Sequence, residues 1–246
     1  MSNAKNMLGL FVGMALCAGS AHAQSPTPST EKFFASVNIG GQLASRTFTS
    51  SITQTVHFET ASLVSSQAVG RGAVIDFGGG YRVWGDVFAG VVVSRFGNSA
   101  DASYSASIPH PVFFNNPRTT TGAVNDLKRS EVAVSPHVVW AMPLTDKIDV
   151  AVAAGVAIIH LSQDLVGSFS VPLNTQDLTP ITTTESGTAA GAYVAADFIY
   201  NLPTTWYGIY GVGGYLRYAG ATVELPSVTD AKVGGFQIGV GIRLRF

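Results

Sequence analysis

Three polar side chains in one stretch of the chain have the types that nucleophilic catalysis requires. Ser135 and His137 lie two positions apart, and Glu131 lies four positions before Ser135. In a strand, residues separated by an even number of positions share one face, so all three would point the same way. A serine beside a histidine, with an acid further along, is the pattern of an acyl-transfer site. A mid-strand histidine is more ordinarily an interior side chain with a satisfied hydrogen bond.

The chain offers little other chemistry. Its histidines at 57, 110, 137 and 160 are scattered and lack the spacing of metal ligands. The glycine run at 78–80 lacks the following helix and the lysine that a phosphate-binding loop needs. We therefore expect no metal site, no cofactor and no enzymatic activity.

Charged residues instead alternate with apolar ones along several segments. In residues 147–162, for example, Asp149 lies between Ile148 and Val150, and the apolar series continues at every second position. A period of two predicts strands with one apolar and one polar face. Because buried charges must pair and arginine suits carboxylates, we expect acids and arginines to pair across an interior. This interior charge set comprises Asp76, Arg82, Glu131, His137, Asp149, Asp197, Arg217, Arg243 and Arg245, with Arg46 and Arg95 higher up.

Eight strands are predicted, at about 32–48, 70–82, 86–97, 129–142, 147–162, 187–200, 206–220 and 233–246. Tight turns at 83–85, 143–146 and 201–205 alternate with long polar segments near 49–69, 98–128, 163–186 and 221–232, read as loops. Trp84, Trp140 and Trp206 all lie at or near the tight turns. Short turns with aromatics on one side and long loops on the other are typical of bacterial outer-membrane barrels.

Composition agrees with a membrane barrel. Only 12% of residues are charged, against about a quarter in soluble domains. The formal net charge of −1 argues against a nucleic-acid surface, which would be basic. Outside the first residues, no apolar run approaches the roughly 20 residues of a transmembrane helix. Alternating strands account for an apolar excess without apolar runs.

The first residues have the form of a cleaved export signal. Residues 1–23 combine Lys5, an apolar run at 7–18 and a small-x-small cleavage site at 21–23. A Pro/Ser/Thr-rich periplasmic leader at 24–31 and a barrel at 32–246 would follow. The only cysteine, Cys17, lies inside the signal after Leu16, so neither lipid attachment nor a disulfide is expected.

These features together resemble the small outer-membrane β-barrel domain family of opacity-protein, OmpX-like and OmpW-like proteins. The resemblance rests on the signal, the eight strands, the segment VWAMPLTDKIDVAVAAG at 139–155 and the terminal GVGIRLRF. It implies an eight-stranded antiparallel transmembrane β-barrel in the outer membrane, with both termini periplasmic. It also implies contact with outer-membrane lipid and lipopolysaccharide, and recognition of the last strand by the barrel-assembly machinery through Ile242, Leu244 and Phe246.

Membership in such a family leaves the role open. The leading hypothesis is a structural or surface-interaction protein, with the lumen plugged by charged side chains and with loops that carry the function. Phe113 and Phe114, between Pro111 and Pro117, are the candidate loop contacts. The alternative is a narrow channel or small-solute carrier. A mid-barrel gap lined by Asn38, Gln42 and Gln237 would favour it. A lipid-modifying enzyme is a more distant third, and would need Ser135, His137 and Glu131 to converge.

Overall fold

The computed structural model describes residues 31–172, 177–202, 209–228 and 230–246, and these ranges hold strands joined by turns. None of the described residues forms a helix long and apolar enough to cross a membrane. The strands are β1 (Phe33–Gln42), β2 (Arg46–Val56), β3 (Glu59–Val69), β4 (Gly72–Trp84), β5 (Val87–Ile108), β6 (Arg118–Thr145), β7 (Ile148–Ser170), β8 (Thr179–Asn201), β9 (Ile209–Val223) and β10 (Ala231–Arg245).

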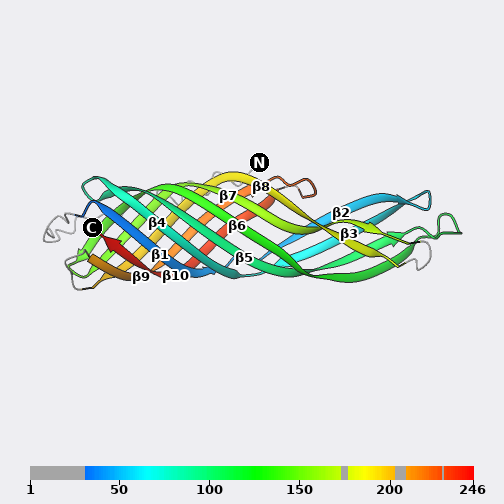
Figure 1. Cartoon of the computed structure of the whole chain (residues 1–246), viewed down its shortest axis with the longest axis horizontal. Coiled ribbons are helices and arrows are strands. Elements are labelled where there is room, and N and C mark those ends of the chain that lie inside the picture. Colours follow the sequence, from blue (N-terminus) through cyan, green and yellow to red (C-terminus); the bar gives the residue numbers. More distant parts are fainter. Residues whose placement is uncertain (1–30, 173–176, 203–208, 229) are drawn as a thin grey trace, which may run out of the picture.

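Eight of the strands close into a ring. β1 pairs with β4 on one side and with β10 on the other, and the antiparallel β5–β6 pairing completes the circuit through β7, β8 and β9. All these pairs are antiparallel, so the predicted eight-stranded antiparallel β-barrel is confirmed. Figure 1 shows the ring strands running obliquely along a long molecule, as closure of a barrel requires.

The two faces of the ring strands follow the predicted alternation. On β10, Phe236, Ile238 and Val240 are exposed on the outside, whereas Gln237 is buried inside. On β5, Ala89, Val91 and Val93 point outward, opposite the buried Phe88 and Val92. An exterior of contiguous apolar side chains is what a transmembrane barrel presents to hydrocarbon.

The tight turns and the chain's C-terminus lie at one end of the ring. Phe33 pairs with Tyr81, and Phe34 pairs with Arg245, which places the start of β1 beside the ends of β4 and β10. Trp84 and Trp140 are both exposed near this end, as predicted, while Trp206 lies outside the described residues. Figure 1 shows the C-terminus at this end.

Three of the four segments predicted as long loops, 49–69, 98–128 and 163–186, are mostly strands, so the prediction was wrong for these three. In the fourth, 221–232, residues 224–228 lie between β9 and β10 and outside any strand, as predicted. The first predicted strand ends early, at Gln42, and residues 49–69 lie in the β2–β3 hairpin. The other two of these three segments lengthen β5, β6, β7 and β8 well beyond the ring. Along residues 102–108, for example, serines alternate with alanine, tyrosine and isoleucine, and threonine, frequent in these segments, is β-branched and favours strands. Polar composition alone suggested loops, but the period of two persists through it.

We call this second part the extension: β2 and β3 together with residues 98–108, 118–128, 163–170 and 179–187. It has its own core, in which Ala61, Leu63, Ala106, Ile108, Val166 and Phe169 are almost fully buried. Strand β3 pairs with β5, and the Gln54 side chain of β2 donates a hydrogen bond of 2.6 Å to the Phe169 carbonyl of β7. Figure 1 shows the extension at the end of the molecule opposite the C-terminus.

Candidate functional site: the charged lumen

The deepest ion pair of the lumen joins β4 to β9. Arg217 Nη1 lies 3.0 Å from Asp76 Oδ2, and the two side chains are 4% and 0% exposed. The Asn38 amide donates to the other Asp76 oxygen, so both carboxylate oxygens are occupied. The Arg217 guanidinium also lies over the Tyr215 and Tyr193 rings. A fully desolvated charge is tolerated only with such complete pairing.

Two further ion pairs lie nearer the turn end. Asp197 of β8 pairs with Arg243, and Asp149 of β7 lies 2.6 Å from Arg245 Nη1. Asp149 also accepts a 2.8 Å hydrogen bond from the Asn201 amide. Both arginines belong to β10, whose strand neighbours are β1 and β9, so these contacts cross the lumen and bypass adjacent strands.

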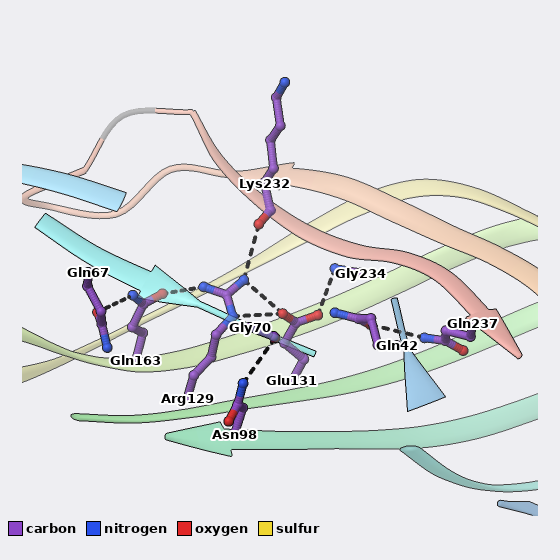
Figure 2. Close-up of polar contacts among 10 residues, drawn as sticks. All are labelled: Gln42, Gln67, Gly70, Asn98, Arg129, Glu131, Gln163, Lys232, Gly234 and Gln237. Atoms are coloured by element: carbon purple, nitrogen blue, oxygen red, sulfur yellow. Dashed lines mark hydrogen bonds and ion pairs between the residues drawn. The ribbon is translucent and has the colours of Figure 1, made fainter. Parts of the chain in front are cut away.

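A larger network of polar contacts lies inside the barrel at the extension end, as Figure 2 shows. Arg129 Nε donates to Glu131 Oε1 at 2.8 Å, and other Arg129 nitrogens donate to the Gln163 side chain and the Lys232 carbonyl. The second Glu131 oxygen accepts the Gly234 backbone N–H at 2.7 Å. Gly234 has φ +70°, a left-handed conformation that turns its N–H toward the carboxylate. The network therefore links β6, β7 and β10 through buried polar atoms.

The same network reaches the hairpin. Gln163 donates to the Gln67 side chain of β3 at 2.9 Å, and the Arg129 guanidinium lies 4.6 Å from the centre of the Phe48 ring of β2. Figure 2 also shows Gln42 and Gln237 side by side, with a hydrogen bond of 3.3 Å between them. Polar contacts thus join the ring strands β6 and β7 to the hairpin strands β2 and β3 at the end of the ring nearest the extension.

The predicted interior residues do not all join these networks. Arg82 lies 3.9 Å from Asp86 at the turn end and over the Phe88 ring. His137 stacks on Tyr193, and its Nδ1 lies 2.8 Å from the Ser135 carbonyl oxygen. Arg46 lines a small cavity beside Glu131, inside the mouth. Arg95 was predicted to point inward and does not: it pairs in register with Ile75 and Val132 on the exposed outer face.

Sequence reasoning missed Arg129, Gln163 and Gln67. The signal for Arg129 was present, since it lies two positions before Glu131 and must share its face. Gln163 and Gln67 lay in segments read as loops, where no face is assigned. The contact between them follows from the position of the hairpin against the barrel, which no local pattern encodes.

The residues considered for catalysis do not form a relay. The Glu131 carboxylate is held by Arg129 and Gly234, and the His137 ring contacts the Ser135 carbonyl oxygen and Tyr193. Within the described ranges, no group of three or more histidines or acids is placed to hold a metal ion. Two cavities beside Asn38, Asp197 and Arg243 have volumes of about 20 Å³ each, room for a water molecule or two.

No protein-family model and no curated protein matches the chain. Among solved structures, the chain is similar to Neisserial surface protein A, with 14% identity and a TM-score of 0.40 over 87% of this chain and 97% of that one. It is similar to the outer-membrane protease OmpT from Escherichia coli, with 9% identity and a TM-score of 0.45 over 92% and 100%. It is also similar to the outer-membrane protein OprG from Pseudomonas aeruginosa, with 7% identity and a TM-score of 0.40 over 88% and 96%. The likeness to all three is one of fold.

Proposed function

We propose that the protein is an outer-membrane β-barrel whose extension makes contacts at the cell surface, while side chains close its lumen. The apolar exterior of the ring supports membrane insertion, because contiguous apolar surface of this extent is unfavourable in water. The tight turns, the exposed Trp84 and the C-terminus then belong on the periplasmic side. The extension, at the opposite end, projects from the cell.

The observation that carries the surface role is the tip of the extension. Phe58 is 95% exposed, and Val112, Phe113 and Phe114 in the β5–β6 connection are also exposed. The backbone N–H of Asn115 donates to Glu59 Oε1 at 2.9 Å, so the two turns are fastened together. The His110 ring packs against Phe113 and accepts the N–H groups of Val112 and Phe113. Apolar side chains displayed on an ordered tip are suited to contact with another surface.

The pairing of the interior charges supports the same assignment over the alternative of a channel. Asp76, Glu131, Asp149 and Asp197 each have an arginine partner, and the arginines 129, 217 and 243 also lie over aromatic rings. An eight-stranded ring has an interior just wide enough for its own side chains. Asn38, Gln42 and Gln237, which would line a channel gap, are hydrogen-bonded within this packing.

The test compares the refolded wild type with Phe113→Ser/Phe114→Ser and with the matched polar control Thr119→Ala/Thr121→Ala. Folding is established by heat-modifiable electrophoretic mobility. In planar bilayers we expect no discrete conductance steps from any of the three. On intact cells with equal surface amounts, we expect the phenylalanine variant alone to lose adhesion to a panel of extracellular-matrix proteins and to other cells. Reproducible conductance steps would establish the channel alternative, and equal adhesion by all three proteins would refute the contact role of the tip.

A further inference from the structure

The outer face of the barrel on β5, β6 and β7 changes abruptly from apolar to polar side chains. Val93, Val134 and Ile158 form one exposed apolar row, matched across the strands by their register. Two positions further toward the extension, the outward residues are Arg95, Val132 and His160. The next outward row is Gly97, Ser130 and Ser162. The hydrocarbon-facing belt therefore ends at Arg95.

A depression of about 520 Å³ opens in this polar surface. Its lining includes Arg95, Lys128, Ser130, Ser162, Asp164 and Thr184. Gly97 forms part of the floor, and a Cβ added there would meet nothing within 4 Å. The groove is thus open outward, directly above the apolar row.

The charges in this groove are arranged differently from those of the lumen. Arg95 and Lys128 are exposed, and in the described part of the chain neither side chain has an ion-pair partner. The one carboxylate of the lining, Asp164, already accepts the Lys128 backbone N–H at 3.1 Å and the Thr184 hydroxyl at 2.6 Å. Along β6, Ser130 lies between Lys128 and Val132, the register partner of Arg95. Ser162 of β7 lies beside Ser130 in the β6–β7 pairing, so two hydroxyl side chains adjoin the two cations.

We propose that this groove binds a phosphate group of lipopolysaccharide in the outer leaflet. A guanidinium, an ammonium and two hydroxyls supply the donors that a phosphate accepts. The acyl chains of the same lipid would run along Val93, Val134 and Ile158. A free anion would make no use of that apolar row, which is why the structure favours a lipid. The assignment rests on the proposed location in the outer membrane, with the extension outside.

The experiment uses the full-length mature protein isolated from outer membranes in mild detergent. Bound lipid is measured as phosphorus and as sugar of lipopolysaccharide per folded barrel, for the wild type, Arg95→Gln/Lys128→Gln, and the conservative pair Arg95→Lys/Lys128→Arg. Lys147→Gln is the matched control, because Lys147 is an exposed cation at the turn end. We expect the glutamine pair to retain about tenfold less lipopolysaccharide, as two charge-assisted contacts are lost. The conservative pair and the control should behave as the wild type.

A second measurement separates the possible ligands. The temperature at which the folded band converts to the unfolded band is recorded after adding lipopolysaccharide, enzymatically dephosphorylated lipopolysaccharide, or inorganic phosphate. Only phosphorylated lipopolysaccharide should raise that temperature, and only when Arg95 and Lys128 or their conservative replacements are present. An equal effect of inorganic phosphate, or equal retention by the glutamine pair, overturns the inference. If the folded wild type and the glutamine pair both fractionate with the outer membrane, failure of the lipid test leaves the proposed location in place. If the folded protein is absent from that membrane, the proposed location fails, and the proposed function fails with it.

Discussion

The pair of Asp76 and Arg217 is the most demanding contact at the scale of single residues. Removing the cation alone, in Arg217→Met, leaves the Asp76 carboxylate fully buried with only the Asn38 amide as a partner. Breaking a buried pair in this way costs about 3–5 kcal/mol. We therefore expect the free energy of unfolding to fall by about that amount in urea titrations of the protein refolded into lipid vesicles.

The double variant Asp76→Leu/Arg217→Met tests whether the loss comes from the uncompensated charge. It removes both charges, so most of the lost stability should return. Arg71→Met, which deletes an exposed outward arginine, is the control and should change stability by less than about 1 kcal/mol. If the double variant is as unstable as Arg217→Met, the contact of the Arg217 guanidinium with the Tyr215 ring is the larger contribution.

At this scale, alternation predicted much of the lumen. Asp76, Asp149, Asp197, Arg217, Arg243 and Arg245 each lie opposite apolar neighbours and were all assigned to the interior they occupy. Which acid meets which arginine was not predictable, because the partners lie on strands that are not adjacent and depend on strand tilt. Arg95 was grouped with the interior charges although Val91 and Val93, which share its parity, are apolar; both faces of residues 86–97 carry apolar residues, so alternation did not fix which face points inward. Arg95 points outward where the apolar belt ends.

At the scale of elements, the β2–β3 hairpin is separable from the ring. Gln42 and Gly72 are paired in register, so residues 44–70 can be replaced by an Asn-Gly turn that joins β1 directly to β4. The ring pairings involve neither β2 nor β3, and the barrel should still fold. The extension should become accessible, because Ala106, Ile108, Val166 and Phe169 lose the cover of Ala61 and Leu63.

Limited trypsin digestion of the folded protein checks this expectation through cleavage after Arg118 and Lys128. The deletion variant should be cut much faster than the wild type, while its heat-modifiable band persists. Phe58→Ser, which alters the turn and leaves the hairpin in place, serves as the control and should be cut at the wild-type rate. Loss of the heat-modifiable band on deletion would show that the ring depends on the hairpin.

The hairpin also marks the limit of prediction for elements. The ring strands were identified because apolar residues occupy every second position along them. Residues 49–69 alternate too, but between polar side chains and small ones such as Ala61, and a polar sequence with period two resembles a loop in composition. What makes it a hairpin is burial of Leu63 against β5 and β7, a tertiary contact.

At the scale of the whole molecule, the last residue closes the ring. Phe246 donates its N–H to the Phe33 carbonyl at 3.0 Å, and its own carbonyl accepts the N–H groups of Lys32 and Phe33. The two phenylalanine rings stack with 5.9 Å between their centres. The seam between β1 and β10 joins the two ends of the barrel sequence, so its formation carries the largest loop-closure entropy of the fold.

Phe246→Ala separates this seam role from recognition during assembly. The backbone bonds of the seam do not need the ring, so refolding into detergent should reach nearly the wild-type yield. In cells, the amount of folded protein in the outer membrane should fall severalfold if the terminal aromatic is what the assembly machinery engages. Phe236→Ala is a closely matched control, since Phe236 lies on the same strand and is 57% exposed against 56% for Phe246. Equal losses for the two variants would mean that the strand needs its aromatics for contact with lipid, and that its terminus carries no separate signal.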